Sequence, residues 1–311
     1  MPGDFTVAGV VKYGQVILQA GKITFESNSK LVLAPLEKNM VAPTTLTIIA
    51  DTISIVDRAE ITYDLDGLPG FDPDTPAPPQ TSIAANGFDG GSSPGEGSYP
   101  QANSGGDGGP GHTGQKGIAG INAPELQIFV GRVEQVNSDA IKVNFKGQDG
   151  GKGGKGGTGG NGGNGQKGAA SQTSDSWYDG DECTREPGRG GNGGKGGDAG
   201  YPGQGGAGGN GGIVKVFVKK DYLPAVQGWN YVISGGKGGP SGAPGQKGKG
   251  GKGGSQGDQN DPCPARPEYH GTDGPDGRLM DDMDPDWHVN YAGKDGLDGD
   301  VGTYELTEVP S

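Results

Sequence analysis

Aromatic and histidine side chains gather in the parts of the chain that contain little glycine. Trp and Tyr on exposed loops are typical of recognition sites. We interpret these side chains as candidate binding residues for a cell-surface receptor or glycan. The alternative is that they pack together as a cap that seals the end of a larger structure. The candidates are Trp177, Tyr178, Tyr269, His270, Trp287, His288 and Tyr291.

Few other residues have the types and spacing that catalysis or metal binding requires. The three histidines show no His/Cys spacing suited to zinc, and no G-x-S-x-G motif marks a nucleophile. Clustered carboxylates at 278–288 and 293–300 could bind calcium, but both stretches lack the apolar position of calcium-binding nonapeptide repeats. Solvated surface acids are the favoured interpretation. The sequence therefore predicts a protein that is not an enzyme and that holds no cofactor or metal.

The two cysteines, Cys183 and Cys263, lie 80 residues apart in segments that interrupt glycine-rich runs. Secreted proteins with small cores often use disulfides to stabilise loops. A bridge between the two is the favoured hypothesis, and two independent thiols are the alternative.

Glycine recurs at every third position in five runs, which cover 105–120, 147–168, 188–212, 236–257 and 293–302. Flexible linkers have no reason to keep this phase. Many triplets carry two glycines and few carry proline, whereas collagen has one glycine per triplet and is rich in proline. In a helix with three residues per turn, each position of the triplet forms one stripe along the helix. Two stripes of glycine, which has no side chain, let the helix pack against neighbouring backbones on two faces. The sequence therefore predicts an antiparallel bundle of polyglycine-II helices, with Lys, Asn, Thr, Gln and Asp in the third, solvent-facing stripe.

Six glycines of the second run represent the bare stripe that should contact neighbouring backbones. They are Gly150, Gly153, Gly156, Gly159, Gly162 and Gly165. At about 3.1 Å per residue, the 19 residues from 150 to 168 would form a rod roughly 60 Å long.

Segments that contain little glycine and many apolar residues alternate with these runs. Residues 1–66, 124–147 and 213–234 are rich in β-branched and aromatic residues that alternate with polar ones, which is typical of strands with one buried face. The fold class predicted is all-β plus polyglycine-II, with a β-solenoid or a β-sandwich as base and essentially no α-helix. We place a β-rich base at 1–66 and a glycine-rich bundle, interleaved with the later β segments, at 67–311.

The order of elements suggests that each glycine run leads out from the base and the next one returns. The intervening segments 169–187 and 258–292 then become loops at one tip, and they carry the candidate binding residues and both cysteines.

The charge of the chain limits its partners. The formal net charge is −13, although residues 146–257 hold 14 basic and 8 acidic side chains. A net acidic protein binds nucleic acid poorly. We interpret the lysines of the middle third as solubilising groups that also bridge to the acidic C-terminal part. No apolar stretch is long enough to span a membrane, and no signal peptide is visible in this chain.

Glycine-triplet runs that alternate with glycine-poor loops resemble the polyglycine-II tips of tail-fibre adhesins from T-even-type phages. The likeness covers about 105–302 and is architectural. The β-rich segments are more similar to bacterial β-solenoid surface proteins with glycine-triplet insertions. Both resemblances imply a non-enzymatic adhesin, extracellular or on a cell surface or virion, in which a rigid rod presents recognition loops. The alternative is a self-assembling subunit of an extracellular filament or matrix.

Overall fold

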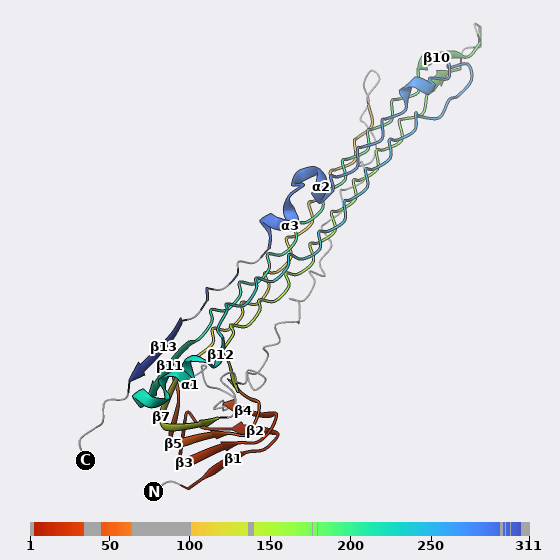
Figure 1. Ribbon diagram of the computed structural model, residues 1–311. Helices are drawn as coiled ribbons and strands as arrows, with labels where there is room; N and C mark the ends of the chain where they lie inside the picture. The colour runs from red at the N-terminus through yellow and green to blue at the C-terminus, as the bar shows by residue number, and fades with distance from the viewer. Residues whose placement is uncertain are drawn as a thin grey trace.

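The computed structural model describes residues 3–33, 45–63, 101–135, 140–175, 177–178, 180–292, 295, 297–298 and 300–305. Within these residues the structure is mostly β-sheet with very little helix, as expected for the all-β class. The base of the molecule is a pair of sheets, and long glycine-rich segments extend from it toward a distant end that carries a small hairpin (Figure 1).

Two parallel sheets form the base, and the chain visits them in turn. The first sheet has the order β1-β3-β5-β7-β11-β13, and the second has the order β12-β8-β6-β4-β2. The strands of the first are β1 (Phe5–Val7), β3 (Ile17–Phe25), β5 (Thr45–Ile55), β7 (Glu125–Gln135), β11 (Ile213–Val218) and β13 (Asp300–Glu305). Those of the second are β2 (Val10–Tyr13), β4 (Ser29–Leu33), β6 (Ala59–Tyr63), β8 (Ile141–Asn144) and β12 (Asn230–Val232).

Matched apolar residues stack across each sheet and make the core. In the first sheet Leu18 pairs with Ile48, Ile48 with Ile128, and Ile128 with Val216, and all four are at most 2% exposed. Alternate residues on these strands point to the core, so a slip of one residue would expose the whole ladder. The strands of 124–147 and 213–234 thereby join the same sheets as the strands of the first 66 residues.

Helices are short. They are η1 (Lys220–Tyr222), α1 (Leu223–Gln227), η2 (Pro267–Tyr269), α2 (Met280–Met283) and α3 (Trp287–Asn290). Helix α1 brings buried Val226 onto the core, and the indole of Trp229, which follows it, donates a 2.9 Å hydrogen bond to Gln135.

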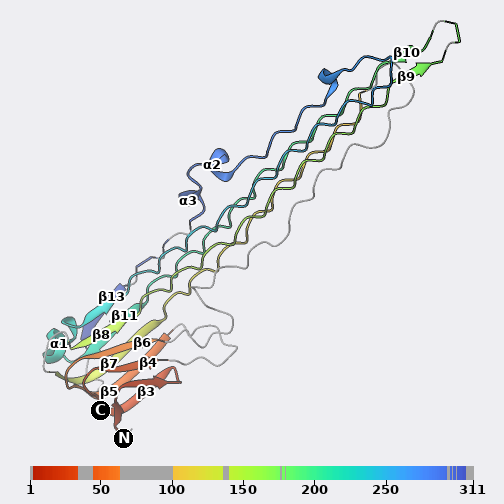
Figure 2. The same ribbon diagram turned by 90° about the vertical axis from the view of Figure 1, so that its right-hand side faces the viewer.

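Five extended glycine-rich runs lie side by side and are here called the glycine array. Runs 2 (145–171) and 4 (234–258) lead away from the sheets, whereas runs 1 (101–123), 3 (188–212) and 5 (269–279, resumed at 291) lead back (Figure 2). Runs 2 and 3 pair antiparallel, as in the Gly203 N–H to Gly154 carbonyl bond of 2.8 Å. Runs 2 and 4 pair parallel, since Gly153, Gly156 and Gly159 donate to successive triplets of run 4. The array thus combines antiparallel and parallel neighbours.

The six glycines predicted to form a bare stripe in run 2 all face run 3. A Cβ on Gly156 would lie against the carbonyl oxygens of Gly200 and Tyr201, the second at 2.6 Å. The same is true of the other five, which would meet backbone carbonyls of run 3. Only glycine permits this close approach of two backbones.

Candidate functional site

The tip is the end of the glycine array farthest from the sheets. It is formed by an antiparallel hairpin of β9 (Gln172–Ser174) and β10 (Glu182–Arg185), seen at the end of the array in Figure 2. The connection between these strands carries Trp177 and Tyr178, whose side chains are 91% and 89% exposed. Their ring centroids lie 6.2 Å apart with planes tilted by 49°. Two adjacent aromatic rings are therefore presented to solvent.

The hairpin is tied to the neighbouring loop by a disulfide between Cys183 and Cys263, which confirms the bridge expected from the sequence. Cys263 is 1% exposed. Beside it, Asn260 donates to the buried Ser171 through its backbone at 2.6 Å and its side-chain amide at 2.8 Å. The base of the hairpin is thus joined by a covalent bond and by hydrogen bonds to the loop that follows run 4.

An ion pair adds a second connection under the tip. Arg266 donates two hydrogen bonds to the Glu186 carboxylate, at 2.9 and 2.6 Å, and these bonds lower the pKa of Glu186. Tyr269 lies between Glu186 and Arg189, whose guanidinium carbon is 4.5 Å from the Tyr269 ring centroid. Of the predicted binding residues, Tyr269 therefore supports the tip, whereas His270 beside it is exposed.

The prediction that Trp287, His288 and Tyr291 lie in a tip loop is wrong. The segment 258–292 is not one loop, because Gly271, Gly274 and Gly277 recur at every third position and donate to run 4. The chain has turned back before α2 and α3, which lie on the flank of the array (Figure 1). The Tyr291 carbonyl accepts from Gly205 of run 3, 17 residues or roughly 50 Å from Gly188 at the tip. The triplets of "GTDGPDG" at 271–277 were the signal that sequence reasoning missed.

The flank residues pack instead of facing a partner at the tip. Trp287 is 8% exposed, and its indole N–H donates to Asp281 at 2.8 Å. The His288 ring stacks on it with centroids 3.6 Å apart, and Tyr291 stacks on Tyr201 at 6.0 Å. This arrangement has the packing expected of a cap, although it covers the side of the array and not its end.

Short polar side chains in the third stripe have a structural role that the sequence interpretation missed. Asp149, Asn161 and Asn164 of run 2 accept the backbone N–H groups of residues 88 positions later in run 4. In run 5, Asp273 and Asp276 accept from glycines of run 4. Each such side chain accepts from an amide that has no backbone acceptor among the described residues. The tail carboxylates therefore bind backbone amides more often than the lysines with which we expected them to pair.

The Asp198 carboxylate of run 3 also accepts a backbone N–H of run 5, and the strength of this contact depends on pH. Arg278 bonds to Asp198 through its guanidinium at 2.7 Å and its backbone N–H at 2.9 Å, and the guanidinium bond lowers the Asp198 pKa from 3.8 to about 2. Since the folded-state pKa is depressed, the stabilisation is full above about pH 4 and is lost as the pH falls through 2. The Arg278 side chain is 60% exposed, so the effect on stability should stay below about 1 kcal/mol.

We expect Arg278→Gln to raise the Asp198 pKa toward its ordinary value, as measured by carbon NMR titration of the carboxyl group. The same variant should keep the Asp149 pKa unchanged, since that carboxyl lies in another run. An Asp198 pKa that stays near 2 would assign the shift to the Arg278 backbone amide and to Lys195, whose Nζ lies 3.4 Å from the Asp198 carboxylate.

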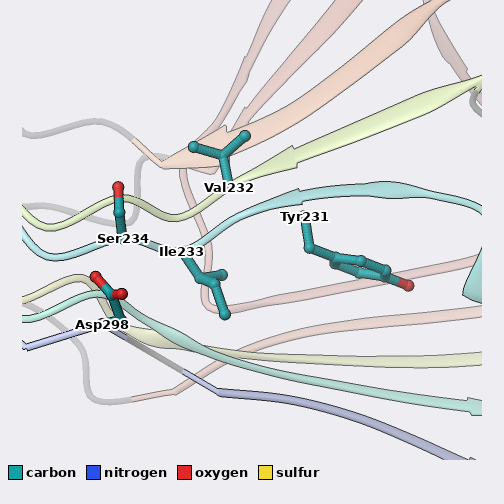
Figure 3. Close-up of a pocket in the computed structure, with 5 residues that line it drawn as sticks. All are labelled: Tyr231, Val232, Ile233, Ser234 and Asp298. Atoms are coloured by element: carbon teal, nitrogen blue, oxygen red, sulfur yellow. The ribbon is translucent and has the colours of Figure 1, made fainter.

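Other kinds of site find little support in the described residues. No group of three or more His, Cys, Asp or Glu side chains among them is placed to hold a metal ion, and no helix in this part of the chain is long and apolar enough to cross a membrane. A hollow of about 370 Å³ lies where run 4 leaves the sheets, lined by Tyr231, Val232, Ile233, Ser234 and Asp298 (Figure 3). Its single carboxylate, on Asp298, accepts the Gly235 N–H at 3.0 Å.

Comparisons of the chain with protein-family models, with curated proteins and with solved structures find no match.

Proposed function

We propose that this protein is a non-enzymatic adhesin in which a rigid glycine-rich shaft holds a recognition tip away from a β base. The observation that carries the proposal is the exposure of Trp177 and Tyr178 at the end of the glycine array, on a hairpin fixed by a disulfide. Exposed aromatic pairs of this kind are unfavourable in water unless a partner covers them. A rigid mounting reduces the entropy that binding must remove.

The shaft in this proposal is a bundle of polyglycine-II helices. The support is the hydrogen-bond pattern, in which successive glycines three residues apart donate to neighbouring runs. Gly191, Gly194 and Gly197 of run 3 donate to residues 166, 163 and 160 of run 2, each at 2.8 Å. This is the period of a helix that has three residues per turn and no internal hydrogen bonds.

The base is proposed to be a β-solenoid and not a sandwich. Strands β1 to β8 alternate between the two sheets, and each of β1 to β6 pairs in parallel with the strand two positions later. After the excursion through runs 2 and 3 of the glycine array, β7 pairs in parallel with β11 and β8 with β12. A coil of this kind lets glycine insertions leave at the end of one strand and return at the start of another without breaking the stack. The disulfide favours an oxidising, extracellular location or a virion surface.

The partner of the tip is proposed to be a surface receptor that carries a glycan. Aromatic faces stack on the apolar faces of sugar rings, and carboxylates accept hydrogen bonds from sugar hydroxyls. Asp175, Asp181 and Glu182 are exposed in the same hairpin as the aromatic pair. Flat rings beside acceptor groups are the combination that a saccharide needs.

Alanine at both Trp177 and Tyr178 should abolish tip binding and leave the melting temperature within about 2 °C, because the two side chains contact almost nothing in the fold. Binding is measured on a printed glycan array with labelled protein. Trp287→Ala is the matched control, since it removes a packed tryptophan of the flank and should lower stability while binding persists. Loss of binding with Trp287→Ala in protein that stays folded would place the contact surface on the flank. Retention of binding by the tip double variant would show that the aromatic pair is not the contact surface.

The second candidate function is a self-assembling filament subunit. Its support is β2, an edge strand of the second sheet whose Val10 is 69% exposed, because an open parallel edge can pair with another chain. Electron microscopy at rising concentration discriminates the two functions. Ordered filaments favour the subunit, and persistent monomers favour the adhesin.

A further inference from the structure

A strip of lysines follows the shaft on one face, away from the tip. Runs 2 and 4 lie parallel, and their third-stripe residues are neighbours, because Asn161 and Asn164 accept the backbone N–H groups of Lys249 and Lys252. Lys152 and Lys155 occupy the same stripe of run 2 as these asparagines, nearer the base. The lysine strip is therefore Lys152, Lys155, Lys249 and Lys252.

The four ammonium groups of the lysine strip are accessible to a partner. All four lysines are exposed, and none forms an ion pair with another residue in the described ranges. Other lysines of these runs do pair, as Lys167 does with Asp258 and Lys247 with Asp276. The charge of Lys249 contributes slightly to the lowered pKa of Asp276. However, the Asp276 carboxylate is already bonded to Lys247 and to the Gly250 N–H.

The spacing of the strip is regular. Within each pair the lysines are three residues apart, or about 9 Å at 3.1 Å per residue, and the pairing of runs 2 and 4 spreads the four over roughly 40 Å. Thr158, Asn161, Asn164 and Gln246 lie between them and offer hydrogen-bonding groups. A protein with a formal net charge of −13 thus carries a straight positive strip.

We propose that this strip binds a linear acidic polysaccharide laid along the shaft. An extended polymer with recurring carboxylates matches a straight row of ammonium groups, and lysine acts as a point charge that needs no fixed geometry. A nucleic acid would be expected to stack its bases on aromatic side chains. None of the third-stripe residues that runs 2 and 4 contribute between 152 and 164 and between 240 and 252 is aromatic. The shaft and the tip then contact different chemical features of the same surface.

Binding to polygalacturonate in low salt tests the proposal, with dextran as neutral control and oligodeoxythymidylate as nucleic-acid control. We expect binding to polygalacturonate that weakens as salt rises, because counterions are released on contact. The variant with glutamine at Lys152, Lys155, Lys249 and Lys252 should lose at least tenfold in affinity. A variant with glutamine at Lys116, Lys195, Lys219 and Lys220 removes the same charge elsewhere and should change affinity less than twofold.

Three results would overturn the proposal. They are binding no stronger than to dextran, an equal loss in the two quadruple variants, and tighter binding to the oligonucleotide than to the polysaccharide. Since all eight lysines are exposed or surface-paired, unchanged circular dichroism and melting temperature verify that both variants fold. The tip double variant at Trp177 and Tyr178 should bind polygalacturonate unchanged, so failure of the strip and failure of the tip are distinguishable.

Discussion

Replacing Gly156 by valine will destabilise the glycine array by about 4 kcal/mol or more, among the largest effects of single substitutions. A Cβ at this position would meet the carbonyl oxygens of Gly200 and Tyr201, and neither run can move away without breaking hydrogen bonds to its other neighbours. The loss is measured as the change in free energy of unfolding in urea.

Lys155→Val is the matched control. It places the same side chain one position earlier, on the exposed stripe, and should change the free energy of unfolding by less than about 1 kcal/mol. Similar losses in the two variants would mean that run 2 does not pack its glycine face against run 3.

Removing the disulfide by Cys183→Ser will unfold the tip locally and leave the base folded. The bridge closes 80 residues of sequence, and the chain-entropy estimate for a loop of this length is about 4 kcal/mol. The variant also leaves Cys263, which is 1% exposed, without its partner. We expect the amides of β9 and β10 to lose protection from hydrogen exchange and glycan binding to weaken strongly.

The fluorescence of Trp229 gives a control for the base in the same sample. Trp229 is 4% exposed in the core of the sheets, far from the bridge, and its transition should be unchanged in Cys183→Ser once the signals of the other two tryptophans, Trp177 and Trp287, are removed by substitution with phenylalanine. A lower melting temperature of the base would show that the bridge stabilises the whole chain. Intact exchange protection at the tip would show that the bonds of Arg266 and Asn260 suffice.

The sequence allowed the local chemistry to be predicted well. Period-two alternation marked the buried ladder residues such as Ile48 and Ile128, because one side of each strand must be apolar. The period-three glycines marked residues such as Gly156 that face another backbone, because every other residue would clash there. The disulfide followed from two cysteines in segments that lie at the same end of the array.

Long-range placement was predicted less well. The return of 271–277 into the array was missed because its three glycines are separated from the run at 293–302 by the short helices α2 and α3. Trp287 and Trp177 both lie in glycine-poor segments, so the sequence does not distinguish them. The pairing of run 5 with runs 3 and 4 shows that Trp287 is packed on the flank, whereas Trp177 is exposed at the tip. The bonds from Asp149 and Asn161 to amides 88 residues later depend on the register between runs, which composition does not reveal.

Amide hydrogen exchange along 150–165 tests the glycine array most directly. Gly153, Gly154, Gly156 and Gly157 donate to neighbouring runs at 2.7 to 3.0 Å, whereas the amides of Lys152 and Lys155 make no backbone bond to any described residue. We expect exchange with a period of three, in which these glycines exchange slowly and these lysines rapidly. Rapid exchange at all of these positions, or slow exchange that ignores the triplet phase, would contradict it.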